Sequence, residues 1–369
     1  MKPENNTSAL DSELDPFILH QVSPEANELL GFEHKSIKEI IDTADIVLDT
    51  NILLRLLVTG TNSIAEVEKI YARLIKEKRI YIPAQVAREY TKNRSEKIKN
   101  LYHDLAQKKQ LQISVSYYPL FEGLEEFKKL AEQEKVLLEK YADYQKNVSD
   151  VLNAIKNWGS SDPVSQMYKR VGLHTRVLHS KHDQKAILAE MNRRYLHKLP
   201  PGYKDGKKED RGIGDFLLWN EILELGKTNK KDLIFITGEE KSDWWDRSDG
   251  SRLHIRYELV DEFRRSSQGK SFQILNFSDF LEYFGATDAV INQAKAEQLS
   301  SSQIDEVNSV PLEVDDESQK TKNSLWPDFP AFVQASELAV KIWMKNKLSR
   351  FIKSINSSGA WGLHLAVWR

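Results

Sequence analysis

The chain has 369 residues, of which 40% are hydrophobic, so it is long enough for one large domain with attachments or for two ordinary domains. Its 53 basic and 55 acidic residues give a formal net charge of -2, so any binding of nucleic acid must depend on a local basic patch. The absence of cysteine excludes disulfides, zinc knuckles and thiol catalysis, and it fits a reducing compartment.

The N-terminal segment MKPENNTSALDSELD lacks the apolar core that a signal peptide requires. No apolar run approaches the roughly 20 residues that cross a bilayer. We therefore expect a cytoplasmic protein without a membrane span. Residues 1–25 are polar, and we expect them to form a flexible N-terminus.

The first predicted elements alternate between helix and strand. A short helix in SIKEIIDTAD is followed by the strand DIVLD at residues 45–49, and apolar residues at helical spacing then predict a helix around 64–74. RIYIP at 79–83 reads as a second strand that ends at its proline. Residues 84–109 predict a helix with one apolar face and a dense row of lysine and arginine on the other.

Between residues 124 and 158 the gaps between apolar residues alternate near three and four, as in a helical hairpin or a coiled-coil seam. We expect these residues to belong to a helical insertion at about 115–195. The loop LPPGYKDGKKEDRGIG then leads into a helix beginning DFLLW, and KKDLIFIT is the clearest strand of the chain.

A further helix and strand follow in YELVDEFRR and SFQILNF. Strands separated by helices predict an α/β fold, with a parallel sheet flanked by helices. We assign this domain to residues 26–285 and a polar linker to residues 286–324. Residues 325–369 hold four of the eight tryptophans and a basic amphipathic pattern, which predicts a C-terminal helical extension.

Four acids follow the predicted strands or open the next helix: Asp49, Glu89, Asp215 and Glu239. The carboxyl ends of parallel strands gather at one edge of a sheet, where ligands bind. Carboxylates brought together there repel each other unless they are protonated or bridged by a cation. Mg²⁺ suits such a site because it prefers hard oxygen ligands, and Mn²⁺ fits as well. This donor set predicts metal-assisted hydrolysis of a phosphodiester.

The segments LDTN, AREY, GIGDFLLW and IFITGEEKSDWW resemble the four acidic motifs of PIN-domain nucleases. The PPGYKD loop and the preceding helical insertion make the chain similar to the bacterial PIN-like subfamily, over about residues 25–285. The resemblance implies a PIN-like, Rossmann-like sheet and an endoribonuclease that uses Mg²⁺ or Mn²⁺. It further implies that Asp49, Glu89, Asp215 and Glu239 are catalytic metal ligands, with Thr50 and Asn51 shaping the first loop.

Relatives commonly carry aspartate after the strand threonine, where this chain has Gly238 and Glu239, so Asp243 is a rival fourth ligand. We expect single-stranded RNA as the nucleic-acid partner. Its phosphates would follow a basic track, with Asn51 beside the acids. The predicted track comprises Lys92, Arg94, Lys97 and Lys99 on one helix, and Lys204, Lys207, Lys208 and Arg211 on the opposite wall.

Ordinary alternatives exist for each of these residues. Asp215 could cap its helix, and Glu89 could pair with Arg88 or Lys92 on the surface. Trp244 and Trp245 could stack a base, although packing into the core is the favoured reading. The histidines at 174, 179 and 182 lack the i, i+4 spacing of a zinc site, so we expect them to be surface residues.

Three other functions remain open. A catalytically weak or inactive PIN-like module would bind RNA without cleaving it. An assembly factor or homo-oligomer would use residues 325–369 for contact with a partner, and the same basic face could instead lie on a membrane surface. A metal-dependent phosphatase is the most distant alternative, since the second aspartate that it needs is replaced by Asn51.

Overall fold

The computed structural model describes residues 14–110, 115–116, 118–179, 183–208, 210–238, 241–249 and 251–297. The chain divides into two compact units, Met1–Asp305 and Glu306–Arg369, and all the described residues lie in the first. The predicted linker beyond residue 297 and the predicted extension at 325–369 therefore lie outside the described residues.

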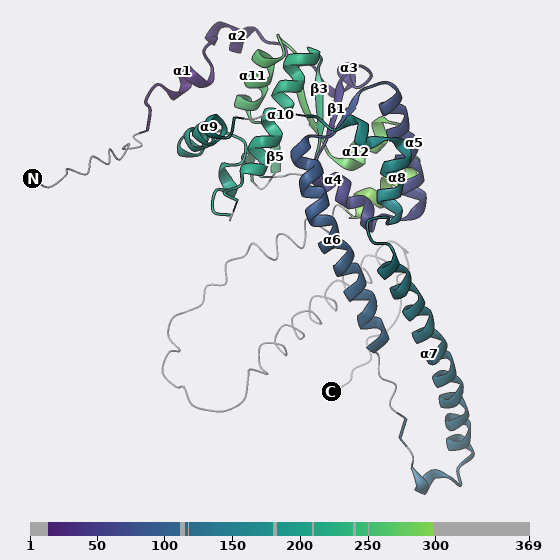
Figure 1. Cartoon of the computed structure of the whole chain (residues 1–369). Coiled ribbons are helices and arrows are strands. Elements are labelled where there is room, and N and C mark those ends of the chain that lie inside the picture. Colours follow the sequence, from purple (N-terminus) through teal and green to yellow (C-terminus); the bar gives the residue numbers. More distant parts are fainter. Residues whose placement is uncertain are drawn as a thin grey trace, which may run out of the picture. The chain divides into compact units, whose positions relative to one another are not determined.

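The described unit has an α/β fold built on a four-stranded parallel sheet, which confirms the predicted fold class (Figure 1). The strand order is β2-β1-β3-β6. Every residue of the two central strands is buried, as expected for a parallel sheet covered by helices on both faces. The strands are β1 (Asp45–Leu48), β2 (Ile80–Tyr81), β3 (Leu233–Ile236) and β6 (Phe272–Leu275).

Helices connect these strands and cover the sheet (Figure 1). The helices are α1 (Ile18–Val22), α2 (Ala26–Gly31), α3 (Ile37–Ile40), α4 (Thr50–Arg55), α5 (Thr61–Lys76), α6 (Ala84–Gln107), α7 (Glu125–Asn157), α8 (Pro163–Val171), α9 (Gln184–Leu196), α10 (Ile213–Asn229), α11 (Tyr257–Ser266) and α12 (Phe277–Tyr283). Strands β4 (Trp245–Ser248) and β5 (Ser251–Ile255) form a separate antiparallel hairpin.

Aromatic side chains fill the core on one face of the sheet. Phe272 of β6 lies 5.1 Å from Trp219 of α10 and 5.6 Å from Phe263 of α11, measured between ring centroids. Phe235 of β3 stacks on Trp244 at 5.2 Å. Trp244 is only 1% exposed, so the prediction that it packs into the core is confirmed. Helices α10 and α11 are fixed to this face by aromatic burial and edge-on ring contacts.

The opposite face is covered by α5, α8 and α12. Tyr71 of α5 lies between Tyr168 of α8 and Phe280 of α12, with ring centroids 6.4 and 6.3 Å away. The Tyr168 hydroxyl donates a 2.8 Å hydrogen bond to the carbonyl of Leu53 in α4. Burial raises the pKa of Tyr168 well above its ordinary value, so the hydroxyl stays protonated and remains a donor. This contact fixes α4, which follows β1 directly.

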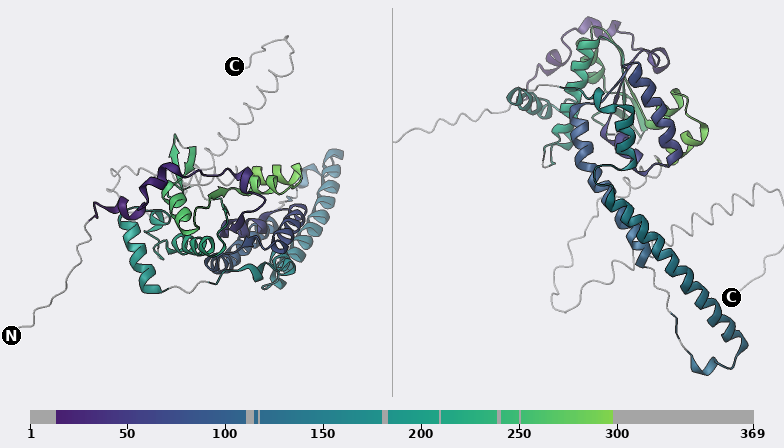
Figure 2. Two further views of the ribbon diagram at one scale, coloured as in Figure 1. Left: turned by 90° about the horizontal axis from the view of Figure 1, so that it is seen from above. Right: turned by 45° about the vertical axis from the view of Figure 1, so that its right-hand side comes forward.

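Helices α6 and α7 run side by side as an arm that extends beyond the sheet (Figure 2). At its base Arg94 of α6, whose side chain is 12% exposed, donates to Asp162 at 2.6 Å and to the Gly159 carbonyl at 2.9 Å. Asp162 also caps α8 by accepting from two of its backbone N–H groups. Burial would raise the pKa of Asp162, but hydrogen bonds from Ser165 and Arg94 hold it below its ordinary value. The arm is therefore anchored by a buried ion pair.

The folded unit extends past both predicted boundaries. Near the N-terminus, Arg265 donates to the Val22 carbonyl at 2.7 Å and Arg264 donates to Glu25 at 3.0 Å, so residues assigned to a flexible terminus contact α11. At the other end, residues 288–297 are helical and bury Val290 in the core, beyond the expected limit at 285. Among the described helices, none combines the length and apolar composition that crossing a membrane requires.

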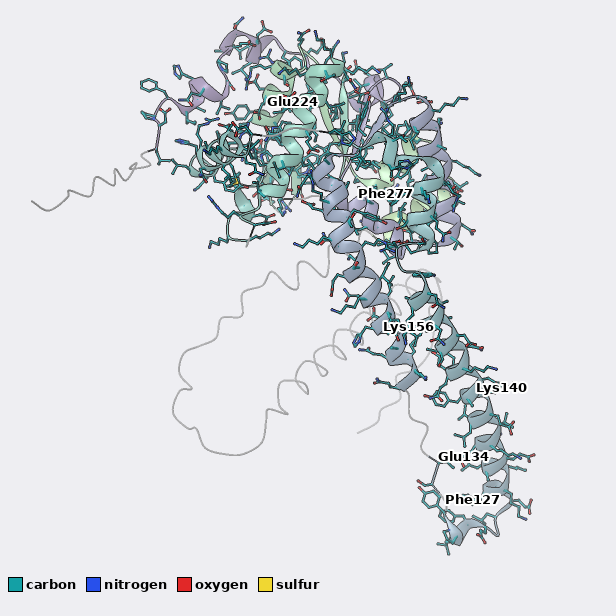
Figure 3. All side chains as sticks on the ribbon, viewed as in Figure 1. Phe127, Glu134, Lys140, Lys156, Glu224 and Phe277 are labelled. Atoms are coloured by element: carbon teal, nitrogen blue, oxygen red, sulfur yellow. The ribbon has the colours of Figure 1, made fainter. Side chains whose placement is uncertain are left out.

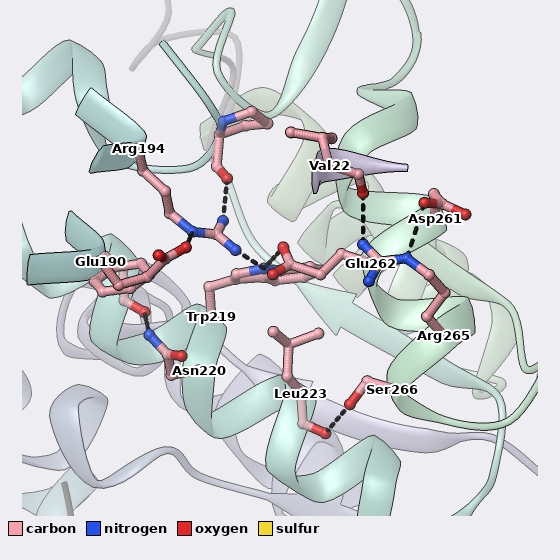
Figure 4. A network of polar contacts seen from close by, with 12 residues as sticks. Val22, Glu190, Arg194, Trp219, Asn220, Leu223, Asp261, Glu262, Arg265 and Ser266 are labelled. Atoms are coloured by element: carbon pink, nitrogen blue, oxygen red, sulfur yellow. Dashed lines mark hydrogen bonds and ion pairs between the residues drawn. The ribbon is translucent and has the colours of Figure 1, made fainter. Parts of the chain in front are cut away.

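A polar network holds α9 and the following loop against the core (Figure 4). Arg194 of α9 donates to Glu190 and to Glu262 of α11, and Glu262 also accepts from the indole of Trp219 at 2.7 Å. Arg194 donates to the Pro200 carbonyl at 2.7 Å as well. The PPGY loop is thereby fixed beside the N-terminus of α10.

Candidate functional site

Hydrogen bonds hold the acid that directly follows β1. Asp49 is the N-cap of α4, and its Oδ1 accepts from the Thr50 backbone N–H at 2.6 Å. Its Oδ2 accepts from the Thr237 hydroxyl at 2.5 Å and from the Asn51 amide at 2.6 Å. Thr237 directly follows β3, so the Asp49 carboxylate lies between the ends of two adjacent strands. These bonds fix its orientation before any ligand arrives.

Asn51 connects the same two strand ends. Besides contacting Asp49, its amide nitrogen donates to the Thr237 hydroxyl at 3.1 Å, and its side-chain oxygen accepts from the Gly238 backbone N–H at 3.0 Å. The chain leaves β1 toward β2 on one side and later enters β3 on the other, so this is the point where strand order reverses. Open α/β sheets bind ligands at such a point.

Glu89 reaches the site from α6 and is tied to the same loop. Its Oε2 accepts from the Thr50 hydroxyl at 2.8 Å, and its Oε1 accepts from Gln85 at 2.8 Å. Thr50 therefore contacts both acids, with its backbone N–H on Asp49 and its hydroxyl on Glu89. This geometry favours the site over the surface pairing with Arg88 or Lys92 as the location of Glu89.

Asp215 lies in the first turn of α10, close to Glu89. A Cβ atom added to the preceding residue, Gly214, would collide with Glu89 Oε1, so α6 and α10 approach closely at this point. The N-cap of α10 is Gly212, which means that Asp215 does not cap its helix. Its side chain is 27% exposed, and its Oδ2 lies 3.9 Å from the ammonium of Lys241.

Lys241 forms a second ion pair across the site. Its ammonium contacts Asp205 at 2.8 Å, and Asp205 also accepts from Lys208 at 2.7 Å. Burial would raise the pKa of Asp205, but Lys208 and Lys241 together hold it below its ordinary value. Asp205 therefore remains ionised, and Lys241 links it to Asp215.

Glu89, Asp205, Asp215 and Lys241 surround one cleft with a volume of about 360 Å³. Helix α6, the loop after the PPGY segment and the start of α10 form its walls. Its lining residues are Gln85, Arg88, Glu89, Lys92, Asn93, Asp205, Lys208, Asp210, Gly212, Gly214, Asp215 and Lys241. Asp49 is joined to this cleft through Thr50 and Glu89.

Asp243, the rival fourth ligand, lies in a structural position. It is fully buried, and its Oδ2 accepts from the Gly202 backbone N–H at 2.8 Å. Gly202 has a φ of +95°, and a Cβ atom there would lie 2.8 Å from the Tyr195 hydroxyl, so only glycine fits the turn. The geometry favours a role for Asp243 in holding this turn. Glu239, the other possibility, lies outside the described residues.

The donor chemistry of the site fits a hard divalent cation. The carboxylates of Asp49 and Glu89 accept hydrogen bonds in defined orientations, and carboxylate oxygens have further lone pairs for a cation. A cationic group, the Lys241 ammonium, already lies beside Asp215. Within the part of the chain that the structure describes, no three acids or histidines are grouped closely enough to hold a metal ion without rearrangement.

The predicted basic track is only partly assembled at the cleft. Lys92 of α6 and Lys208 of the opposite loop both line it. Arg94 instead forms the buried pair with Asp162. Arg211 donates to Asn192 at 2.6 Å on the surface. The remaining lysines, Lys97, Lys99, Lys204 and Lys207, are exposed outside the cleft lining.

Sequence reasoning did not identify Asp205, Lys241 or Arg88 as residues of the site. Asp205 belongs to the PPGYKD segment and Lys241 to IFITGEEKSDWW, so both lie inside the quoted motifs. Their place inside these motifs is the sequence feature from which Asp205 and Lys241 could have been predicted as site residues. His174 and His179 are exposed, whereas His182 lies outside the described residues.

A protein-family model described as PIN like domain matches residues 45–259, which is more than half of the chain. The matched range contains Asp49, Glu89, Asp215 and the whole cleft lining. Comparison with curated proteins gives no match, and comparison with solved structures gives none.

Proposed function

Since the chain belongs to the PIN-like domain family, we propose that it is a divalent-metal-dependent endonuclease that cleaves RNA. Membership indicates a nuclease-type module in general. The observation that carries the specific proposal is the fixed pair of acids at the switch point: Thr50 orients both Asp49 and Glu89, and Asp215 lines the same cleft as Glu89.

In this proposal Asp49 and Asp215 are the principal metal ligands, and Glu89 and Glu239 complete the set. A bound Mg²⁺ or Mn²⁺ would supply an activated water and neutralise charge on the phosphoryl group. The chain's own contribution is to hold the acids in place. Thr50, Asn51 and Thr237 orient the carboxylate of Asp49, while Thr50 and Gln85 orient that of Glu89.

The substrate would enter between α6 and the loop that carries Lys208. Lys92 and Arg88 on one wall and Lys208 on the other offer positive charge to a phosphate backbone. With a volume of about 360 Å³, the cleft is small compared with a base-paired duplex, which favours a strand without base pairing. We therefore propose single-stranded RNA as the substrate.

A magnesium titration of an end-labelled single strand tests the proposal. We expect products only when Mg²⁺ or Mn²⁺ is present, and we expect Asp49→Asn to reduce cleavage at least about 100-fold while the protein stays folded. An RNA and a DNA strand of the same sequence distinguish the two substrates. Cleavage by Asp49→Asn at the wild-type rate would remove Asp49 from the mechanism.

A second candidate is an RNA-binding module that binds the strand without cleaving it. The observation in its favour is that Lys241 already neutralises Asp205 and Asp215. Under this reading a gel-shift experiment shows retention of the strand, and the magnesium titration shows no product at any concentration. The endonuclease proposal requires product in the same samples.

A further inference from the structure

The arm formed by α6 and α7 has an apolar column that the nuclease site does not use. The inner side of α7 packs toward α6, where Val148 and Leu152 are buried. Beside this inner side, α7 partly exposes four apolar residues that recur at intervals of seven. These are Leu130 (48% exposed), Leu137 (51%), Tyr144 (39%) and Val151 (50%).

A repeat of seven residues keeps an apolar column on one side of a helix that supercoils with a partner, because two turns of a coiled coil contain seven residues. From Leu130 to Val151 the column runs for roughly 30 Å along α7, at about 1.5 Å per residue. The distal part of α7, near Glu134 and Lys140, projects away from the sheet and its helices (Figure 3). The column is therefore accessible to another helix of similar length.

The two flanks of this column differ. One flank faces α6: Val148 is 5% exposed, and the Tyr141 hydroxyl donates to the Lys109 carbonyl at 3.3 Å. The other flank is exposed and carries Lys129, Val136, Asp143 and Asp150. In an antiparallel helix pair the same flank of each helix lies against the other. The exposed flank is therefore suited to contact with a second copy of itself.

The charges on the exposed flank are complementary in that arrangement. Pairing Leu130 with Val151 of the second copy, and Leu137 with Tyr144, places Lys129 within two residues of Asp150 of the second copy. Two residues correspond to about 3 Å of helical rise, which a lysine side chain spans. Within the described part of the chain, neither Lys129 nor Asp150 forms an ion pair of its own. Because the dimer has a twofold axis, the Lys129–Asp150 pair occurs twice in the interface.

We propose that the protein forms a homodimer in which this column and its exposed flank on α7 pack antiparallel against the same surface of a second copy. The interface is isologous, as in most homodimers, because each copy contributes the same column and the same flank. The apolar column supplies the buried surface, and the Lys129–Asp150 pairs select the antiparallel register. The proposal does not depend on the nuclease site, which lies at the opposite end of α6.

Sedimentation velocity on the full chain, between about 1 and 100 µM, tests the proposal. We expect a dimer for the wild type, and we expect Leu137→Glu to weaken dimerisation at least about tenfold in the dissociation constant. The thermal midpoint at low concentration should stay unchanged, because Leu137 is half exposed in one copy. Leu188→Glu on α9, at a residue 43% exposed, is the matched control and should remain a dimer.

Charge reversal tests the register. Lys129→Glu alone should weaken the dimer, because it sets two acids against each other, and Lys129→Glu combined with Asp150→Lys should restore it. A wild type that remains a monomer throughout the concentration range overturns the proposal. So does a dimer that Leu137→Glu leaves intact. Failure of the double variant to recover any dimer overturns the antiparallel register.

Discussion

The hydroxyl of Thr50 donates a 2.8 Å hydrogen bond to Glu89, although the two residues belong to different helices and are 39 positions apart. Thr50 is 6% exposed and also donates its backbone N–H to Asp49. One buried residue thus sets the relative position of the two acids from β1 and α6. In the proposed site, Thr50 is a positioning residue and not a ligand.

Thr50→Val should keep the shape of the side chain while removing the donor to Glu89. We expect cleavage to fall about 10-fold or more and the free energy of unfolding to fall by about 1 kcal/mol, since one hydrogen bond is lost. Thr50→Ser retains the hydroxyl and should recover most of the activity. The measurement is the initial cleavage rate at saturating Mg²⁺ together with urea unfolding. Equal rates for the valine and serine variants would show that the hydroxyl does not position Glu89.

Lys241→Met should change the response of the protein to metal. Without the ammonium, Asp205 and Asp215 lose a compensating charge, so the metal-free protein should melt at a lower temperature. A divalent cation then no longer competes with Lys241, and the increase in melting temperature caused by Mg²⁺ should be larger than in the wild type. Differential scanning calorimetry with and without Mg²⁺ measures both effects.

The matched control for this variant is Lys208→Met, because Lys208 pairs with Asp205 but not with Asp215. Its effect on the Mg²⁺ response should be the smaller of the two. A Lys241→Met protein whose melting temperature rises less on adding Mg²⁺ than that of the wild type would mean that Lys241 assists the cation and does not compete with it.

Two variants at Asp243 separate structure from ligation. Asp243→Ala leaves the buried N–H of Gly202 without its acceptor and should cost about 1–3 kcal/mol of stability. Asp243→Asn keeps an acceptor oxygen, so its stability and its cleavage rate should stay near those of the wild type. If the asparagine variant instead loses the Mg²⁺ response as completely as Asp49→Asn, Asp243 is a ligand.

Asp45 provides a pH-dependent prediction far from the cleft. It is 1% exposed at the start of β1, and burial raises its pKa above the ordinary 3.8, against the opposing effects of Asn229 and Lys231. A raised folded-state pKa means that Asp45 favours the folded state at pH values below 3.8 and loses this contribution as the pH rises through the folded pKa. Asp45→Asn should therefore be more stable than the wild type at pH 7.

Urea unfolding of both proteins at pH 7 and at about pH 4 measures this effect. The advantage of Asp45→Asn should shrink at the lower pH, since the wild-type carboxyl then takes up its proton in the folded state. An advantage that grows as the pH falls would contradict the raised pKa of Asp45.

The sheet and the position of Asp49 were predictable because they depend on local pattern. DIVL and LIFI are continuous apolar runs, which is how strands covered on both faces appear in a sequence, and the acid follows the first run directly. The order of the strands then places Asp49 at the switch point. Glu89 was predictable only through its motif, since its partner Thr50 lies on another element.

The remaining features depend on contacts between distant segments. Arg94 belongs to a basic helix face by sequence, but its guanidinium pairs with Asp162, which only the return of the chain through α7 brings near. Asp243 looks like a candidate ligand in the sequence, since it is an acid shortly after a strand, and its burial against the Gly202 N–H becomes visible only in three dimensions. The helix at 288–297 fell within the predicted polar linker, and only its packing in three dimensions shows that it buries Val290 and Ile291 in the core.

The most direct test of the central claim is anomalous diffraction from crystals of the protein soaked in Mn²⁺. The proposed site predicts a manganese peak within coordination distance of Asp49, with Glu89 or Asp215 as a further ligand and Lys241 displaced from Asp215. A fully soaked crystal with no peak beside Asp49, or with manganese bound only at acids outside this cleft, would contradict the assignment.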